Sequence, residues 1–287
     1  MPPGPALPAR HDDALFRRFP LTGTHVTGHG ATVPTPFHAY DADGTVVYGT
    51  ARLDSLERLA QGSGYRPVAT TDGRGFASLW FVRYADSCIG PYTETVIMTP
   101  AAKTPQQVPW RNALTPVAPT FLPGTRLLSL RLLLPADNTV AIDYGRELNG
   151  LDKHPASQID FRVDGQQYTY AILEGGAPAV RFHFTEDRSL GGQLKAAVAL
   201  AQNIGAGKLV ANAMRRWLDL DVVSGLPGFQ GKVTHGHLKS TPRFTLVDGS
   251  ALEIGESAYG AQLRELGFAP TVASHDAHLK FVLEAAR

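Results

Sequence analysis

The sequence lacks several features that define whole classes of protein. Cys88 is its one cysteine among 287 residues, so no intramolecular disulfide can form and nothing indicates an oxidising compartment. No stretch reaches about 18 uncharged apolar residues, and the first residues contain no basic segment followed by an apolar run. We therefore expect no membrane span, no secretory signal peptide and no membrane partner, and a cytoplasmic location is the default.

Charge is also scarce and balanced. Lysine and arginine number 27 against 26 aspartates and glutamates, which gives a net charge of +1, and charged residues make up 18% of the chain. Without a sequence-wide positive field to attract phosphates, a nucleic-acid partner is not expected. The hydrophobic content of 43% favours a well-packed globular body, and the length allows a substantial core.

The abundant turn formers, 29 glycines and 21 prolines, favour a strand-rich fold over a helix bundle. A hairpin is predicted over 158–173, where two alternating runs meet at Asp164-Gly165. Other runs rich in β-branched, aromatic and aliphatic residues lie between Gly, Pro, Asp and Asn and predict strands. These runs cover 45–50, 78–84, 92–98, 126–134, 139–144 and 179–185.

Helical spacing is rarer. Leucines at three-residue spacing predict a short amphipathic helix over 51–60, a longer pattern covers 194–218 with breaks at its glycines, and a last helix is predicted over 277–285. Because strands outnumber helices and do not alternate with them, we expect an α+β fold built on a mainly antiparallel sheet or barrel with a few helices. We expect a flexible arm over 1–15 and a single domain over 16–287.

Motifs for phosphate and metal binding are incomplete. Gly205 to Lys208 is too short for a phosphate loop and is followed by Leu209 instead of a hydroxyl residue, so a helix break is the preferred interpretation. His235 and His237 could share one strand face, but no third ligand stands at a recognised spacing. His275, Asp276 and His278 lie where Asp276 or its neighbour Ser274 could cap the predicted last helix. We expect no metal and no other cofactor.

Nucleophile motifs are equally sparse. The chain has no Gly-x-Ser-x-Gly elbow, and Cys88 has no base that the sequence can place beside it, so we expect a small buried thiol. The remaining candidate is the segment DYGRELNGLDKHPA over 143–156. If it is helical, Arg146, Asn149 and Lys153 share one face, which could bring a cation, an amide and an amine together. Taken alone, the same pattern also suits a solvated surface lysine.

Three motifs resemble the acetoacetate decarboxylase-like superfamily in the right order. GREL followed by a basic position resembles that family's Schiff-base segment, and its reactive lysine matches Lys153. CIGPYTETVIM over 88–98 resembles a family strand whose glutamate matches Glu94. The carboxyl-terminal segments STPRFTLVDG, AYGAQLRELGFAP and ASHDAHLKFVLEA resemble its closing strand, loop and helix. The resemblance spans roughly 79–287, and the first 75 residues match poorly.

Two positions depart from the family pattern. The family's decarboxylases carry a second lysine directly after the reactive one, where this chain has His154, and a proline before it, where this chain has Asp152. The family's decarboxylases also carry a carboxylate on a strand some fifteen residues before the position of Glu94. Counting back from Glu94 without gaps, this chain has Leu79 at that place. Both changes remove charge from the expected site, so acetoacetate itself is not the expected substrate, whereas imine formation at Lys153 is unaffected.

The resemblance implies a lyase that acts on a small keto acid through an imine and an enamine at Lys153, either by decarboxylation or by aldol-type condensation and dehydration. The departures favour the second reaction slightly. An exposed lysine is almost wholly protonated at neutral pH, so the amine must be desolvated or lie beside another cation to become nucleophilic. We expect desolvation to contribute more here than it would with a second lysine.

The resemblance also assigns roles to neighbouring residues. Glu94 is the expected acid/base group, with an exposed strand position as the alternative. Arg146 could hold a substrate carboxylate or instead pair with Glu147, and Asn149 could bind the substrate. His154 could act as a second acid/base or lie at the surface. A homo-oligomer is implied as well. The competing hypotheses are a non-catalytic small-ligand-binding protein that retains the fold, and a metal-dependent enzyme that uses the paired histidines.

Overall fold

A computed structural model describes residues 13–130, 134–156, 158–205 and 218–287. Its main sheet closes into a barrel, because β6 pairs with β7 and so joins the two ends of a ring of strands. Around the ring the order is β7, β9, β15, β16, β19, β3 and β6, and all neighbours are antiparallel except β9 and β15. The ring strands are β3 (Phe37–Arg52), β6 (Arg74–Ser87), β7 (Tyr92–Ala102), β9 (Thr125–Ser129), β15 (Leu218–Ser224), β16 (Val233–Lys239) and β19 (Ala269–Leu283).

Shorter strands extend the barrel sheet, and two smaller sheets accompany it. The extensions are β4 (Arg66–Pro67), β5 (Ala69–Thr70), β8 (Gln107–Val108), β10 (Leu134–Ala136), β11 (Lys153–Pro155) and β17 (Arg243–Leu246). One smaller sheet is the hairpin of β1 (Gly23–Val26) and β2 (Thr32–Thr35). The other contains β12 (Gln158–Asp164), β13 (Gln167–Glu174), β14 (Ala177–Thr185) and β18 (Leu252–Ile254).

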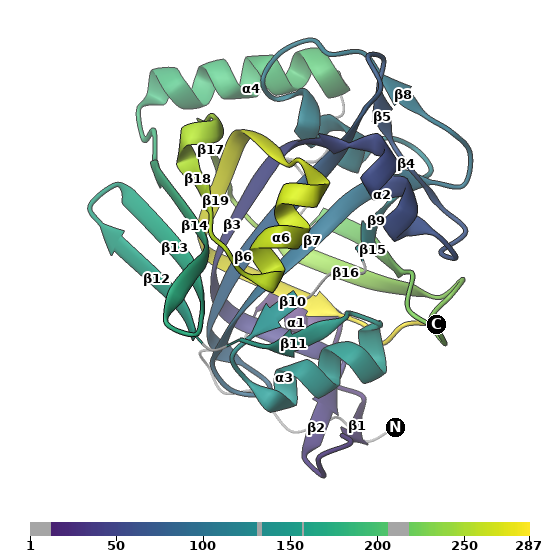
Figure 1. Ribbon diagram of the computed structural model, residues 1–287. Coiled ribbons are helices and arrows are strands. Elements are labelled where there is room, and N and C mark those ends of the chain that lie inside the picture. The colour runs from purple at the N-terminus through teal and green to yellow at the C-terminus, as the bar shows by residue number, and fades with distance from the viewer. Residues whose placement is uncertain (1–12, 131–133, 157, 206–217) are drawn as a thin grey trace.

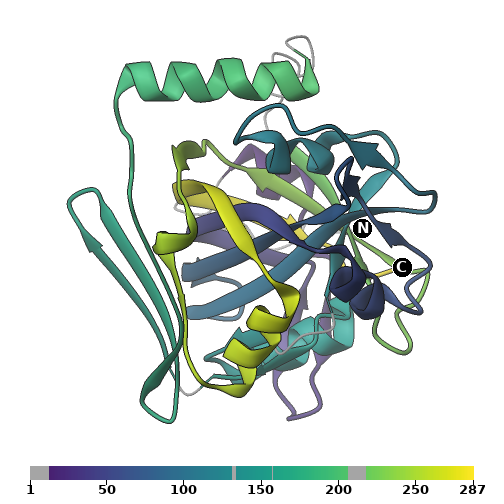
Figure 2. The ribbon, with the colours of Figure 1, turned by 45° about the horizontal axis from the view of Figure 1, so that its top comes forward.

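The helices lie around the barrel and at its ends. Figures 1 and 2 show α4 across one end and α3 near the opposite end. In the part of the chain that the structure describes, no helix is long and apolar enough to cross a membrane. The α-helices are α1 (Ala14–Arg18), α2 (Leu53–Ala60), α3 (Thr139–Tyr144), α4 (Leu190–Ile204) and α6 (Ala258–Leu266); η2 (Thr115–Phe121) and η4 (Gly249–Ala251) are 3₁₀ helices, and η3 (Gly145–Asn149) is a π-helix.

The barrel wall separates two apolar regions because side chains alternate along each strand. On β6, Trp80 and Val82 face a cavity inside the barrel. The odd-numbered Phe81 is fully buried on the other face, where its ring stacks on Tyr170 of β13 at 4.9 Å between centroids. The outer face therefore forms a core with the second sheet, while the inner face remains available for a ligand.

The predicted fold class is confirmed, since a mainly antiparallel barrel with a few helices is what the chain forms. The hairpin over 158–173 is also confirmed, because β12 and β13 pair in register on either side of Asp164-Gly165. The predicted strands over 45–50, 78–84 and 92–98 lie within β3, β6 and β7, the strand over 179–185 lies within β14, and the helix ending at Ala60 is α2.

Two predicted elements are wrong. Residues 139–144 form the helix α3 rather than a strand, because Asn138 caps the backbone N–H of Ala141 at 3.0 Å and the helix packs on buried Ala141 and Ile142. The predicted helix over 277–285 belongs to β19 through Leu283, which pairs with β3. Register shifts between Asp276 and Leu279 and between Leu279 and Phe281 interrupt the strand alternation there, and the resulting apolar spacing resembled a helix.

The structure describes three other predicted elements only in part. The strand expected over 126–134 is divided between β9 and β10, and 131–133 lie outside the described residues. The helix expected over 194–218 corresponds to α4 up to Ile204, while 206–217, which include most of the glycine-lysine motif, lie outside them as well. Of the expected arm, residues 1–12 are not described, and Leu15 in α1 is fully buried. The domain division stays a prediction.

Candidate active site

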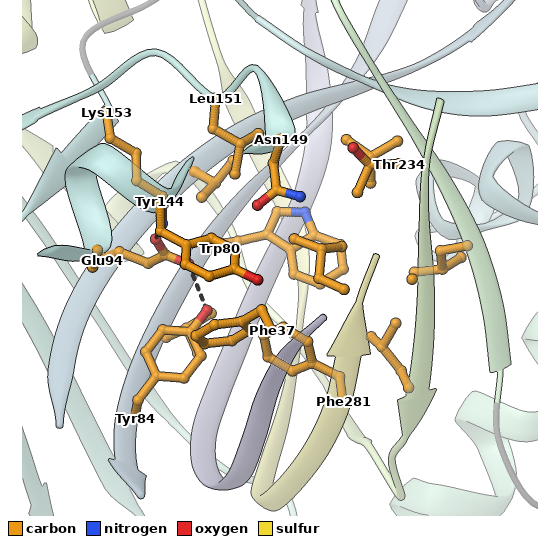
Figure 3. A pocket seen from close by; sticks show the side chains of 18 of the residues that line it. Phe37, Trp80, Tyr84, Glu94, Tyr144, Asn149, Leu151, Lys153, Thr234 and Phe281 are labelled. Carbon is orange, nitrogen blue, oxygen red and sulfur yellow. Dashed lines mark hydrogen bonds and ion pairs between the residues drawn. The ribbon is translucent and has the colours of Figure 1, made fainter. Parts of the chain in front are cut away.

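The candidate site is a cavity of about 90 Å³ inside the barrel (Figure 3). Each strand of the ring contributes at least one side chain to its lining, and α3 and β11 contribute others. Among the described residues of the lining, only Lys153 and Glu94 carry a charge, and most of the others are aliphatic or aromatic. An apolar cavity with a few convergent polar groups is the usual form of a small-molecule site.

The path of the chain brings Lys153 into this cavity. The π-helix η3 ends at Gly150, whose backbone is left-handed with φ +66°, a conformation that glycine adopts without steric cost. The chain then enters β11, where Lys153 pairs with Leu134 of β10. Gly145 leaves room for the lysine side chain, because a Cβ there would lie 2.6 Å from Lys153 Cδ. As a result Lys153 is only 4% exposed.

Glu94 meets the lysine from the barrel wall. On β7 it pairs with Val82 of β6 and with Ala136 of β10, and it is 6% exposed. Its Oε2 forms an ion pair with Lys153 Nζ, and its Oε1 accepts a hydrogen bond from the Tyr84 hydroxyl at 2.5 Å. A buried carboxylate and a buried amine are thus in direct contact, so a proton can pass between them without crossing solvent.

Two tyrosines complete the surroundings of this pair. The Tyr92 ring centroid lies 5.4 Å from Lys153 Nζ, within range of a cation–π interaction, and the ring stacks on Tyr84. Burial raises the pKa of Tyr84 and of Tyr92 well above the usual value, and the negative charge of Glu94 raises both further. Both hydroxyls therefore stay protonated at neutral pH, and Tyr84 acts as a hydrogen-bond donor to Glu94.

The predicted site residues separate into two groups. Lys153, Glu94 and Asn149 line the cavity, although the Asn149 side-chain amide donates a hydrogen bond to the Glu284 carbonyl at 3.0 Å. Arg146 and His154 do not line it, and they contact each other at 3.2 Å between Nη2 and Nδ1. His154 Nε2 also lies 3.1 Å from Asp152 Oδ1. Both side chains are partly exposed, so neither reaches a ligand in the cavity as described.

The shared helical face considered for this segment does not form. The helical backbone ends at Asn149, and Lys153 lies on a strand, so Arg146 and Lys153 diverge. Leu79, the position reached by the ungapped count, pairs with Ile97 and does not line the cavity. The β6 residues that face the cavity are Trp80, Val82 and Tyr84.

Sequence reasoning missed four hydroxyl-bearing residues of the site, of which Tyr92 lies two residues before Glu94 on the same strand. Tyr84 could have been found, because a period of two along β6 carries the lumen-facing series from Trp80 to Tyr84. Tyr144 and Thr234 also line the cavity, but they lie on segments distant from Glu94 in the sequence, and no local pattern links them. Closure of the barrel brings these segments together.

The other candidate sites have structural partners. His235 Nδ1 lies 2.8 Å from Asp221 Oδ1, and His237 contacts Asp219 and Glu284 at 2.7 and 3.1 Å. Across the described ranges, no group of three or more histidine, cysteine and carboxylate side chains could hold a metal ion.

Burial also shifts the pKa of two residues that the sequence analysis considered, Cys88 and His275. Burial raises the pKa of Cys88 to about 11, so its thiol stays protonated at neutral pH. Burial also lowers the pKa of His275, whose Nδ1 lies 2.9 Å from the Thr45 hydroxyl. Because His275 lies in β19, it belongs to a strand and not to the start of a helix.

Comparison with solved structures gives the fold a name. The structure matches a crystal structure of acetoacetate decarboxylase from Legionella pneumophila with a TM-score of 0.56 and 15% sequence identity, over 88% of this chain and 86% of that chain. A second structure of acetoacetate decarboxylase matches with a TM-score of 0.53 and 15% identity, over 88% of each chain. No protein-family model and no curated protein matches the sequence. The resemblance inferred from the sequence is therefore confirmed as a resemblance of fold: this chain has the acetoacetate decarboxylase fold.

Proposed function

We propose that this protein is a Schiff-base-forming lyase that acts on a small keto acid, with Lys153 as the nucleophile and Glu94 as the acid/base group. The observation that carries the proposal is the buried ion pair between these two side chains in an apolar barrel lumen. The adjacent carboxylate can accept a proton from the amine when the carbonyl substrate arrives. The shared fold with acetoacetate decarboxylase supports the same assignment.

The chemistry follows from this contact. The neutral amine of Lys153 attacks the substrate carbonyl carbon, and the former carbonyl oxygen leaves as water after protonation by Glu94. The iminium that results withdraws electrons from the adjacent carbon. A β-keto acid then loses carbon dioxide, and the bonding pair of the broken C–C bond forms an enamine. Protonation of the enamine carbon and hydrolysis of the iminium by water release the ketone and restore the lysine.

The lining favours decarboxylation over aldol-type condensation. A 2-oxo acid keeps its carboxylate through the reaction, and among the described lining residues no arginine or second lysine is available to hold it. A β-keto acid instead loses its charge as carbon dioxide. The slight preference for condensation rested on His154 and Leu79, and neither of these residues lines the cavity.

The cavity also bounds the size of the substrate. Its volume of about 90 Å³ is smaller than the ~150 Å³ of a protein cavity known to hold benzene. We therefore expect a substrate of few non-hydrogen atoms, which suits a short-chain keto acid and excludes a bulky one.

Reductive trapping tests the proposal. The protein is incubated with acetoacetate, pyruvate or a short methyl ketone in the presence of borohydride, and intact mass and peptide mapping locate any adduct. We expect an adduct at Lys153 that Lys153→Ala abolishes, and release of carbon dioxide from a β-keto acid. Lys103→Met, which removes an exposed lysine, is the matched control and should leave trapping unchanged.

The competing outcomes are distinct. Reversible ligand binding with no adduct and no product, unchanged by Lys153→Ala, would identify a non-catalytic binding protein. Condensation products without carbon dioxide would identify the aldol-type branch. Light scattering after size-exclusion chromatography tests the homo-oligomer that the resemblance implies.

A further inference from the structure

Two hydroxyl groups in the cavity lack a partner. The Tyr144 hydroxyl and the Thr234 Oγ1 are buried, each on a residue that is 2% exposed, and neither has a hydrogen-bond partner among the described residues. Both side chains line the same cavity as Lys153 (Figure 3). A buried hydroxyl without a partner is unfavourable, so these two groups point to a ligand or solvent that satisfies them.

Other polar side chains of the lining are already satisfied by the protein. The Trp80 indole N–H donates to Ser78 Oγ at 2.8 Å, the Tyr84 hydroxyl donates to Glu94, and the Asn149 amide donates to a backbone carbonyl. Tyr144 and Thr234 therefore differ from their neighbours in having a hydrogen-bonding capacity that is free for a ligand.

Of the two hydroxyls, that of Thr234 lies away from Lys153. Thr234 lies on β16, which is separated from β7 by β9 and β15 on one side of the ring and by β19, β3 and β6 on the other, so it faces Glu94 across the lumen. Figure 3 shows Thr234 on the opposite side of the cavity from Lys153, with the Tyr144 ring extending between them. A ligand joined to the lysine would extend toward both hydroxyls.

We propose that the substrate carries a second oxygen, a hydroxyl or carbonyl group, on the chain beyond the reacting carbonyl, and that this oxygen binds to the hydroxyl of Tyr144 or of Thr234, whichever the chain length brings within reach. The substrate class is thus a short, oxygen-substituted keto acid and not a plain alkyl one; this inference rests on the proposed function. Burial raises the pKa of Tyr144, so its hydroxyl stays protonated and can donate to the ligand oxygen. Thr234 can donate or accept.

Such hydroxyls would contribute to specificity. A site built to hydrogen-bond an oxygen rejects the analogue that lacks it, because the buried hydroxyls of the site are then left unpaired. Most of the remaining lining residues are aliphatic or aromatic.

The experiment compares ketones that differ only at the far end. The probes are 4-hydroxybutan-2-one and 5-hydroxypentan-2-one, each with the isostere in which a methyl group replaces the hydroxyl. Calorimetric affinity is measured on the Lys153→Met variant, where no imine can form, and borohydride trapping is measured on the chain with Lys153 intact. We expect at least one hydroxyketone to bind about 3- to 10-fold more tightly than its isostere, the range for one or two net hydrogen bonds.

Matched variants test whether Thr234 and Tyr144 cause this preference for the hydroxyketone. At least one of Thr234→Val and Tyr144→Phe should reduce it toward unity. Thr95→Val is the control: the Thr95 hydroxyl is also buried without a partner, but Thr95 does not line the cavity, so the preference should persist. The proposal is overturned if the methyl-ended ketones bind as tightly at both lengths, or if the preference survives both cavity substitutions.

The two proposals fail separately. A hydroxyl preference in binding, with no adduct at Lys153, would overturn the Schiff-base function and support the binding role of the two hydroxyls. Equal trapping of hydroxylated and plain ketones would support the function and overturn the inference about the substrate.

Discussion

Glu94→Gln should destabilise the protein severely, because it removes the charge partner of a buried amine. Lys153 and Glu94 are 4% and 6% exposed, so neither charge is solvated by bulk water. Removing one partner of a buried ion pair typically costs about 3–5 kcal/mol, a large part of a total unfolding free energy of about 5–15 kcal/mol. Glutamine retains an oxygen that can accept from Tyr84, so the substitution changes charge more than shape.

A double-mutant cycle isolates this contribution. Lys153→Met and Glu94→Gln should each lower the free energy of unfolding by about 3–5 kcal/mol, whereas the double variant should recover to within about 2 kcal/mol of the original, because no uncompensated charge remains. The exposed pair of Arg181 and Glu253, 3.1 Å apart, provides the control cycle. Its coupling energy should stay below about 1 kcal/mol.

Urea denaturation at neutral pH, followed by fluorescence and circular dichroism, measures each free energy of unfolding. Additive effects of the two buried substitutions, to within about 0.5 kcal/mol, would refute the argument, since independent side chains give additive costs. A double variant that recovers fully would show that the pair contributes no net stability relative to uncharged side chains.

Three further substitutions test other parts of the structure. Gly145→Ala should displace the Lys153 side chain and slow ketone trapping at least tenfold, while Gly191→Ala, in open space on α4, should leave the rate unchanged; equal rates in both would contradict the packing. Although burial raises the pKa of Asp13, hydrogen bonds from two lysines and a backbone N–H lower it to about 2. The pKa of Asp13 in the folded protein is therefore below its value of 3.8 in the unfolded chain, so ionised Asp13 should contribute about 1–2 kcal/mol of stability above pH 3.8, which is lost as the pH falls toward 2. Asp13→Asn retains the helix cap and should abolish this part of the acid-unfolding slope. Trp80 lines both the candidate site and a second apolar cavity of about 90 Å³, so its side chain forms a wall between the two. Trp80→Ala should therefore allow longer ketones to be trapped, and an unchanged limit on ketone length would argue against this shared wall.

Local patterns predicted the parts of this fold that depend on local causes. The β12–β13 hairpin follows from a turn sequence between two alternating runs, and α2 follows from regularly spaced leucines. Residues 139–144 have strand propensity but form a helix, because a capping asparagine and tertiary packing outweigh that propensity. In β19, interrupted pairing with β3 produced an apolar spacing that periodicity alone could not distinguish from a helix.

The site could be predicted only where a motif carried it. Lys153 and Glu94 were identified by resemblance, and they are adjacent in the cavity. Tyr144 and Thr234 come from an end helix and a distant strand, and closure of the ring brings both into the lining of one cavity. No single sequence contains that information in its local pattern, because lumen neighbours are set by strand order and register.

The alternation of side chains along β11 also bears on the residue that follows Lys153, the nucleophile of the proposed function. Successive side chains on a strand point to opposite faces, so the neighbour of a lumen-facing lysine cannot itself enter the lumen. His154 follows this rule and lies beside Arg146 and Asp152, outside the cavity. A second lysine at this position would meet the same carboxylate and the same solvent, and its charge would be screened there. Under the proposed function, the amine of Lys153 is therefore controlled from within the barrel, by the apolar lining and by Glu94, and His154 contributes to neither.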